Sequence, residues 1–469
     1  MALPSLASLP QSGSIVSRWY LGEGSGTRDD AVGSNDLTDN NTVTSASGKF
    51  GTDAADFERG NSEYLSITDA SQTGLDFTSA FTLSAWVKLE TSAGASDSLI
   101  MRKFGSNGYS FYINTAGVLG VYIHNGTTDE NVEDTYVFET GIWYHVAVVY
   151  AQNSRLTLYI NGREVDESTT TIPTSLPGNA DTFYMGSTAG SSNFFDGLIL
   201  DATAWSVALT DAEVESLFLA YYTIPATSTF PQNGSIVSRW PLVEEAGIRL
   251  DMVSTNDLTD NNTVAFGTGQ STSGSDFISA ADFELDNAEY LSKTDNAALS
   301  IVGDLSFAAW VKFEDIPASG YRGIFGKYGT SGDQRGYALE LGVSSSVQTL
   351  QFTVSSTGTS GTTKSVTASF VSGTWAHVAV VYDASAGEVD FYVNGVALGS
   401  TQTGLPTSIY DGTSAFVIGA WSSAGADPND GLIQDAVLWS YELSASEVLS
   451  AYNAYFSSTG FMSLNRGFW

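Results

Sequence analysis

Hydrophobic positions along the chain follow the two-residue period of β-strands more often than the period of helices. The clearest example is residues 143–150, followed by residues 156–160, which are rich in β-branched and aromatic side chains. Such side chains pack well on a pleated surface. In the second run Leu156, Leu158 and Ile160 alternate with Thr and Tyr, and an Asn-Gly pair follows, which favours a tight hairpin turn. The pattern predicts two antiparallel strands and a turn that leads to a third strand.

The chain repeats this pattern, because residues 375–382 and 389–395 match the first copy in kind and order. The segment Gly-Ser-Ile-Val-Ser-Arg-Trp also occurs twice, beginning at Gly13 and again at Gly234, 221 residues later. A period of this length is far longer than that of stacked repeat proteins, so it indicates a duplicated domain. We therefore expect a leader at 1–9, a first domain at 10–222, a linker at 223–230, a second domain at 231–456 and an aromatic tail at 457–469.

Each half ends with the sequence signature of a helix N-terminus. Thr210 precedes Glu213 by three residues, and Ser444 precedes Glu447 by the same spacing. A hydroxyl side chain and a Glu at this spacing can each accept a hydrogen bond from a backbone N–H group of the first turn. Apolar residues follow at helical spacing, so a short helix is expected to pack against the β-core of each half.

Composition limits the classes of protein to consider. At 469 residues the chain is expected to hold two or three domains, and 42% hydrophobic residues are enough for packed cores. A net charge of −34 repels phosphate groups, so nucleic acid is not expected as a partner. The absence of cysteine excludes disulfides and thiolate chemistry. No run of about 18 apolar residues predicts a membrane span, and the N-terminus lacks the basic residue and apolar core of a secretory signal.

A series of short motifs occurs in the same order in both halves. The first half has Trp19, Asp56-Phe57, Ala85-Trp86-Val87-Lys88, Trp143-Tyr144-His145 and Asp196-Gly197. In this order the motifs resemble those of the LamG-like (laminin G, concanavalin A-like) jelly-roll domains. The resemblance implies an all-β fold of two tandem concanavalin A-like jelly-roll β-sandwiches, each closing with a short helix. Four tryptophans are then expected in or near the cores: Trp86, Trp143, Trp310 and Trp375.

The resemblance also implies a calcium site in each half, because many relatives hold one calcium ion between an early Asp-Asn loop and a late Asp. Calcium binds six to eight oxygen atoms from carboxylates, amides and carbonyls. Relatives often have two acidic residues at the late position, where this chain has one. The alternative is that these side chains cap turns. The implied ligands are Asp30, Asn35 and Asp201 in the first half and Asp251, Asn256 and Asp435 in the second.

No residue is assigned a catalytic role. Some concanavalin A-like sandwiches are glycosidases whose carboxylates alternate on one strand, and hydrolysis needs two carboxyl groups at a set separation. The closely spaced carboxylates Glu164, Asp166 and Glu167 follow a turn and have no counterpart in the second half. His145 and His377 occupy one equivalent strand position among apolar neighbours, which is typical of structural histidines rather than general bases. The sequence therefore predicts a protein that is not an enzyme.

Recognition of a glycan or a protein partner is the remaining candidate, since LamG-like domains commonly bind through loops or through a sheet face. Trp421 lies in a loop whose counterpart in the first half, at 186–188, has no aromatic residue. It is therefore the predicted ligand-binding residue, as a platform for stacking, against the alternative that it packs within its domain. The aromatic tail is expected to dock on its own domain or on a neighbouring subunit. In the second case the protein would form an oligomer.

Two interpretations of the function stay open. The first is a non-enzymatic surface or structural protein of a virion, as a capsid decoration or tail-associated protein that binds glycan or protein partners. The acidity, the lack of cysteine and the aromatic tail favour it, and the tail would then contact other virion subunits. The alternative is a secreted or cell-surface carbohydrate-binding adhesin, with a polysaccharide-degrading enzyme less favoured. The expected location is a virion, the extracellular space or the cell surface.

Overall fold

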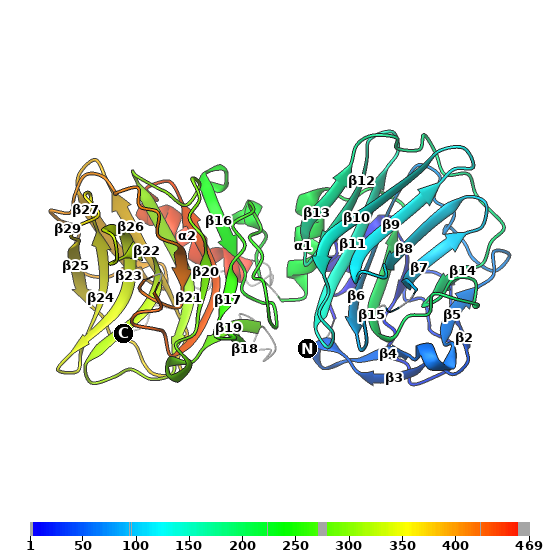
Figure 1. The fold of residues 1–469 in the computed structure, drawn as a ribbon, viewed down its shortest axis with the longest axis horizontal. Coiled ribbons are helices and arrows are strands. Elements are labelled where there is room, and N and C mark those ends of the chain that lie inside the picture. Colours follow the sequence, from blue (N-terminus) through cyan, green and yellow to red (C-terminus); the bar gives the residue numbers. More distant parts are fainter. Residues whose placement is uncertain are drawn as a thin grey trace. The chain divides into compact units, whose positions relative to one another are not determined.

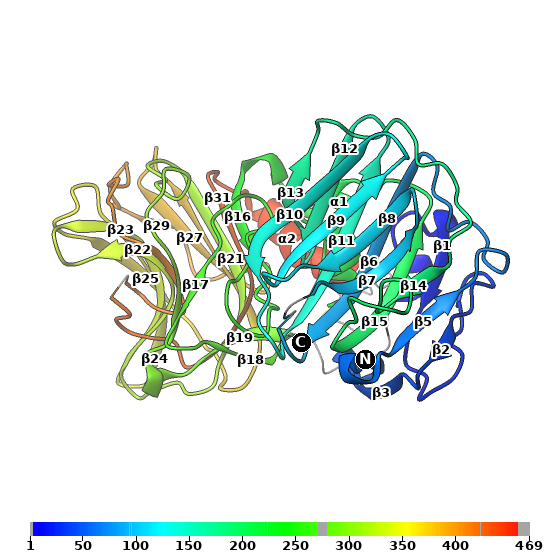
Figure 2. The ribbon, with the colours of Figure 1, turned by 45° about the vertical axis from the view of Figure 1, so that its right-hand side comes forward.

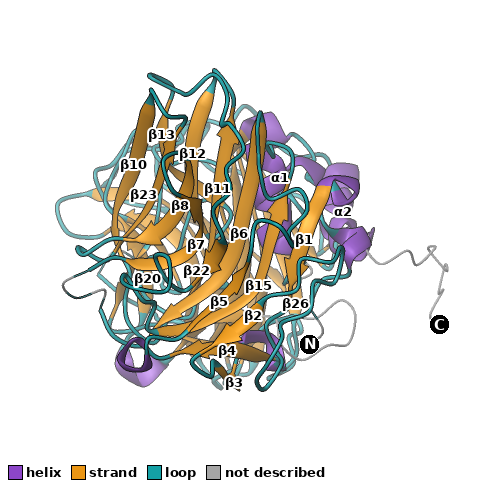
Figure 3. Ribbon diagram, turned by 90° about the vertical axis from the view of Figure 1, so that its right-hand side faces the viewer, coloured by secondary structure: helices purple, strands orange, loops and turns teal. Residues whose placement is uncertain are grey.

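The computed structural model describes residues 3–92, 94, 96–222, 224–270, 279–422 and 424–457. It divides into two compact units, Met1–Tyr221 and Tyr222–Trp469, which we call domain 1 and domain 2 and describe separately. Both are built mainly of strands, as Figure 3 shows. Except for Ser457, the predicted aromatic tail lies outside the described residues.

Domain 1 consists of two antiparallel sheets (Figure 1). In the part of the chain that the structure describes, the first sheet has eight strands, one of which, β1 (Ile15–Trp19), pairs with β15 beside the main path. The other seven follow the spatial order β13 (Arg163–Ser168), β12 (Arg155–Ile160), β11 (Trp143–Ala151), β6 (Ala80–Leu89), β15 (Gly197–Trp205), β4 (Asp53–Phe57) and β3 (Thr44–Ser47).

The second sheet of domain 1 carries the candidate site, and several of its strands run side by side in Figure 2. Its spatial order is β10 (Asp129–Val137), β9 (Val118–His124), β8 (Gly108–Ile113), β7 (Ser98–Phe104), β14 (Phe183–Met185), β5 (Tyr64–Ile67) and β2 (Thr38–Asn40).

Domain 2 repeats this arrangement. Its first sheet runs β18 (Ala265–Thr268), β19 (Ser279–Phe283), β31 (Gly431–Trp439), β21 (Leu305–Phe313), β26 (Ala376–Asp383), β27 (Glu388–Val393) and β28 (Val396–Ala397), with β16 (Ile236–Trp240) paired to β31 and β29 (Gln402–Thr403) paired to β27. Its second sheet runs β17 (Thr259–Asn261), β20 (Tyr290–Lys293), β30 (Phe416–Ile418), β22 (Gly320–Gly329), β23 (Gln334–Ser344), β24 (Val347–Val354) and β25 (Thr362–Thr367).

The core of each domain lies between its two sheets. In β12, Leu156, Leu158 and Ile160 belong to the buried cluster of domain 1, whereas the alternating residues Thr157 and Tyr159 do not. This is the alternation that the sequence predicts, since successive side chains of a strand point to opposite faces. The predicted fold of two tandem β-sandwiches is therefore confirmed.

One helix closes the sandwich of each domain among the described residues: α1 (Asp211–Ala220) and α2 (Ala445–Ser457). Thr210 and Glu213 form both hydrogen bonds of the predicted capping box. At α2, the backbone N–H of Glu447 donates to Ser444 Oγ, and the N–H of Ser444 donates to Glu447 Oε2. No described helix is long and apolar enough to cross a membrane.

The closing helices cover tryptophans on the outer face of the first sheet. Trp86 on β6 and Trp310 on β21 are buried there, not between the sheets. The ring of Trp86 lies 5.9 Å from that of Phe218 on α1, and the ring of Trp310 lies 5.5 Å from that of Tyr455 on α2. Both are therefore near-core anchors that join sheet to helix. Of the other two predicted anchors, Trp143 is buried and Trp375 is partly buried.

Candidate functional site

A line of polar and aromatic side chains crosses the outer face of the second sheet of domain 1. Strand pairing places these residues directly beside one another on five adjacent strands, and Met101, Phe111 and Val121 next to them in sequence belong to the core. Because side chains alternate along a strand, the line points away from the core. We call it the outer row; its residues are Tyr184, Arg102, Ser110, Tyr122 and Asn131.

The outer row forms the floor of a depression with a volume of about 430 Å³. Four of its five members line this depression, and further residues of the same strands and of neighbouring loops complete the wall. The volume is within the range of small-ligand sites, about 300–1,000 Å³. The lining residues are Asp97, Leu99, Arg102, Ser110, Tyr112, Tyr122, Asp129, Asn131, Thr188 and Asn193.

Hydrogen bonds fix the polar groups at one end of the depression. The hydroxyl of Tyr112 lies 2.7 Å from Asn131 Oδ1 and 2.9 Å from Glu133 Oε1. Burial and the neighbouring Glu133 raise the pKa of Tyr112 above its usual range, so the phenol stays protonated. Burial, and then Glu133, also raise the pKa of Asp97. This end therefore offers hydroxyl, amide and carboxyl groups that can donate and accept hydrogen bonds.

Arg102 is the cation at the centre of the depression. Its Nη1 donates to Ser110 Oγ at 2.5 Å and its Nη2 donates to the carbonyl of Phe104 at 3.3 Å. Its guanidinium carbon lies 4.7 Å from the centre of the Phe104 ring. The ring of Phe104 in turn lies 5.4 Å from that of the half-buried Tyr122. Burial lowers the pKa of Arg102, with Asp181 acting in the opposite direction.

Domain 2 has no equivalent set of side chains on the same face. The positions that pair in the same way are Val417, Gly326, Ala338, Thr353 and Thr363. The chain folds back over this face at Trp421, because a Cβ atom on Gly326 would lie 2.5 Å from the carbonyl oxygen of Trp421. The described residues of domain 2 therefore place backbone and small side chains where domain 1 has its depression.

Trp421 itself, the predicted ligand-binding residue, is half-buried. Its ring lies 4.4 Å from the ring of Tyr328, a buried residue of β22. One face or edge of the indole is thus occupied by packing within domain 2. A stacking role for the remaining surface of Trp421 stays a prediction.

The predicted calcium residue Asp201 already has a cationic partner. Arg18 donates from Nε to Asp201 Oδ1 at 2.7 Å and from Nη2 to Oδ2 at 2.6 Å, and both side chains are fully buried. The hydroxyl of Tyr221 donates to the same Oδ2 at 2.8 Å. In domain 2, Arg239 and Tyr455 bind both oxygens of Asp435 in the same way.

The other predicted calcium residues hold the backbone of their own loops. Asp30 accepts the N–H groups of Arg18, Val32 and Asn35, and Asp251 accepts the matching three N–H groups in domain 2. Asn35 Oδ1 accepts the N–H of Thr73 at 2.7 Å, and Asn256 Oδ1 accepts the side-chain amide of Asn296. These oxygens are satisfied by the protein and, with arginine on Asp201 and Asp435, the six residues do not fit a calcium ion. The contacts of the loop residues agree instead with the turn-capping alternative, whereas Asp201 and Asp435 form ion pairs.

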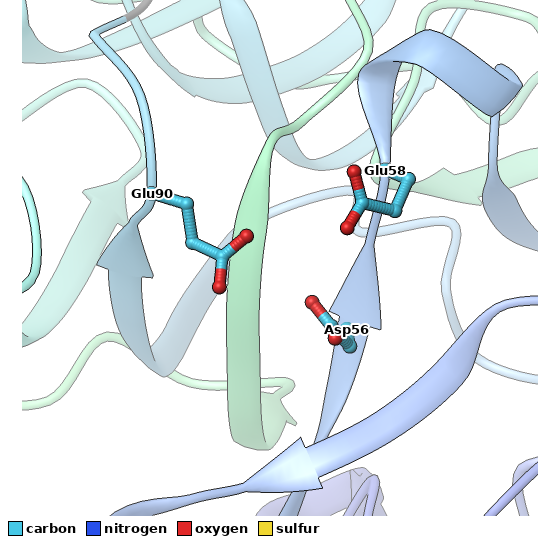
Figure 4. Close-up of side chains that lie close together, drawn as sticks. All are labelled: Asp56, Glu58 and Glu90. Atoms are coloured by element: carbon cyan, nitrogen blue, oxygen red, sulfur yellow. The ribbon is translucent and has the colours of Figure 1, made fainter.

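In each domain, three acidic side chains that are not among the predicted calcium residues lie close together. Oxygen atoms of Asp56, Glu58 and Glu90 lie within 4.8 Å of one another, as do those of Asp282, Glu284 and Glu314. Figure 4 shows the first group facing each other on either side of an intervening strand. Burial and, second, nearby Glu314 raise the pKa of Asp282 to about 6. Both glutamates of each group are exposed, so the groups are mutually repelling carboxylates on an acidic surface.

His145 and His377 lie among aromatic side chains and not in a cleft. The ring of His145 is fully buried and lies within 6.0 Å of the rings of Trp86, Phe218 and Tyr221. Neither ring nitrogen of either histidine has a hydrogen-bond partner among the described residues. Burial lowers the pKa of both histidines to about 3, so they are neutral packing residues near pH 7.

Two sandwiches with this strand order define a protein of the jelly-roll class. The family model of the concanavalin A-like lectin/glucanases superfamily matches residues 59–215 and 285–449, and the chain belongs to that superfamily. The resemblance found in the sequence is therefore confirmed. No curated protein matches the chain.

The chain is also similar to solved structures at low sequence identity. Domain 4 of AbnA, a GH43 extracellular arabinanase from Geobacillus stearothermophilus in complex with arabinotriose, is 20% identical over 44% of this chain and 98% of that chain, with a TM-score of 0.35. Domains LG4-5 of the mouse laminin alpha1 chain are 11% identical over 82% and 88%, with a TM-score of 0.29. The Ruminococcus gnavus IT-sialidase CBM40 bound to alpha2,3 sialyllactose is 19% identical over 31% and 84%, with a TM-score of 0.27.

Proposed function

We propose that the protein is a non-enzymatic carbohydrate-binding protein and that the depression on domain 1 holds the glycan. The observation that carries this proposal is the outer row itself, in which Tyr122, Arg102 and Asn131 lie side by side in a 430 Å³ depression. A sugar ring needs an apolar surface for its C–H face and fixed donors and acceptors for its hydroxyl groups. The half-buried ring of Tyr122 supplies the first, and the polar members of the row supply the second.

Membership of the lectin and glucanase superfamily supports this proposal in general terms, since it contains proteins that act on carbohydrates. The comparison between the domains assigns the proposed glycan site to domain 1. At the position of Tyr122 domain 2 has Thr353, and at the position of Arg102 it has Gly326. The two domains therefore serve as internal controls, with glycan binding assigned to domain 1.

The test is direct titration of glycans that a glycan array identifies. Tyr122→Ala removes the aromatic surface and is expected to weaken binding by about 10-fold or more. Thr353→Ala changes the matching position of domain 2 and is expected to leave the affinity unchanged. Equal effects of the two substitutions, or an array with no bound glycan, would contradict the proposal.

The alternative function within the same superfamily is hydrolysis of glycosidic bonds. Glycoside hydrolysis would release reducing ends from a polysaccharide panel, and such turnover by the purified protein would overturn the non-enzymatic part of the proposal. The setting on a virion, with the adhesin as its alternative, stays a prediction. Mass spectrometry of purified particles would decide between them, because an adhesin would be found in the medium or on the cell surface and not in particles.

A further inference from the structure

We propose that the glycan held by domain 1 carries a carboxylate group and that Arg102 binds it; this rests on the proposed function. The ligand class is then an oligosaccharide that contains an acidic sugar such as a hexuronate. The observation behind the proposal is a cation inside the depression that lacks an anionic partner.

Arg102 keeps unused hydrogen-bond donors. A guanidinium has five N–H groups, and the described residues accept from two of them, through Ser110 and Phe104. The Nε atom is shielded from solvent and has no partner among the described residues. Because a ligand cannot reach a shielded atom, the donors available to it are the remaining N–H groups of Nη1 and Nη2 on this partly buried side chain.

Asp181 compensates the positive charge of Arg102 only from a distance, without an ion pair. Arg102 forms no ion pair with any described residue, although the chain carries a net charge of −34. Its neighbour on β7, Lys103, points to the opposite side and pairs with Asp69 at 3.0 Å and Asp76 at 2.8 Å. Arg18 pairs with Asp201. Lys103 and Arg18 are thus already paired with carboxylates of the protein, whereas Arg102 can still pair with an anionic group of a ligand.

The surroundings of Arg102 favour a planar anion of low charge. The guanidinium is held against the ring of Phe104, which fixes its orientation, and its planar fork matches a carboxylate with two parallel hydrogen bonds. Asp97 and Asp129 line the same depression. These groups can accept hydrogen bonds from sugar hydroxyls, and they oppose ligands that carry several charges, such as phosphorylated sugars.

Matched pairs of oligosaccharides test this inference. Each pair has the same linkages and differs only in carrying a hexuronate or the corresponding neutral hexose, and both members are titrated against the full chain at two salt concentrations. We expect the acidic member to bind about 10- to 100-fold more tightly, with an advantage that shrinks as salt rises. Arg102→Gln is expected to abolish this advantage, so that the acidic and neutral members of each pair bind the variant within about 3-fold of one another, whatever its affinity for the neutral member.

A control substitution separates a local contact from a change in overall charge. Arg335→Gln removes one positive charge from domain 2, where Arg335 is partly exposed and pairs with Asp333, and it is expected to preserve the advantage of the acidic member. If acidic and neutral members bind wild-type protein equally, the inference is overturned and the proposed function stands. If no member of any pair binds, the proposed function fails as well. The ratio of the affinities of the wild-type protein for the acidic and neutral members decides the question even if Arg102→Gln does not fold.

Discussion

Arg18 and Asp201 form a doubly hydrogen-bonded ion pair in which neither side chain is exposed, although the two residues lie 183 positions apart in the sequence. The pair joins β1 to β15. Asp201 sits at an irregularity of the pairing between β15 and β6 and has a left-handed backbone with a φ of 49°, a conformation that Asp tolerates better than most residues. Arg18 Nη1 also donates to the carbonyl of Pro4, so the arginine ties the residues before the first strand to the domain.

Removing the arginine from this pair is expected to destabilise domain 1 strongly. Arg18→Ala leaves the charge of Asp201 buried and uncompensated, which typically costs about 3–5 kcal/mol. Denaturant unfolding of the full chain should then show an earlier transition for domain 1 and an unchanged one for domain 2. Arg239→Ala is the matched control and should shift the transition of domain 2 instead. A loss below about 1 kcal/mol in both variants would contradict a structural role for the pair.

Calcium removal is expected to leave the melting temperature unchanged, because arginine already neutralises Asp201 and Asp435. An ion bound at 100 times its Kd would add about 2.7 kcal/mol to stability. In a domain of this size that corresponds to a shift in Tm of about 5–10 °C. Thermal unfolding with EDTA and with added calcium measures the difference. A fall in Tm with EDTA would restore the calcium prediction, and Asp30→Asn against Asp56→Asn would then locate the ion.

The sequence predicts the strands, the duplication and the helix caps because each depends on local pattern. The alternation at Leu156, Leu158 and Ile160 and the capping box of Thr210 and Glu213 involve residues within a few positions of one another. Such short-range patterns report directly on the period of the strand and on the first turn of a helix.

The outer row could not be predicted because it depends on strand register. Arg102, Ser110 and Tyr122 come together only through pairings that include an irregularity between Leu99 and Met101. A change of register by one residue would turn these side chains into the core. The role of Arg18 had a signal in the sequence, since an arginine recurs before tryptophan in the same short strand of both halves. Its partner Asp201 is distant in the sequence, and the resemblance implies calcium binding for it instead.

Acid is expected to destabilise both domains through their buried histidines. The pKa of His145 is lowered to about 3 in the folded protein, below the unfolded value of 6.5, by burial. As the pH falls below 6.5 the unfolded chain takes up a proton that the folded domain does not, so stability decreases from pH 6.5 down to pH 3. At pH 5 the loss is about 2 kcal/mol for each histidine.

The substitution His145→Phe keeps an aromatic ring in the cluster of Trp86, Phe218 and Tyr221 and removes this titration. Unfolding of domain 1 should then lose about 2 kcal/mol less between pH 6.5 and pH 5 than in the wild-type protein. His377→Phe should have the same effect on domain 2. An unchanged pH dependence in both variants would show that the histidines are not neutral in the folded state.

Glu340 gives domain 2 a pH dependence of the opposite sign. This residue of β23 is 6% exposed, and burial, followed by the charge of Asp427, raises its pKa to about 8 from 4.5. The folded domain therefore retains a proton that the unfolded chain has lost, and stability decreases as the pH rises from 4.5 to 8.

Glu340→Gln replaces the carboxyl group by a neutral amide of similar shape. At pH 8 it should stabilise domain 2 by about 4 kcal/mol, and at pH 4 it should have little effect. Domain 1 has Tyr112 at the matching position, so its transition should not move. Denaturant unfolding at pH 4, 6 and 8 measures the difference, and a stabilisation that is the same at every pH would mean that Glu340 does not titrate in this range.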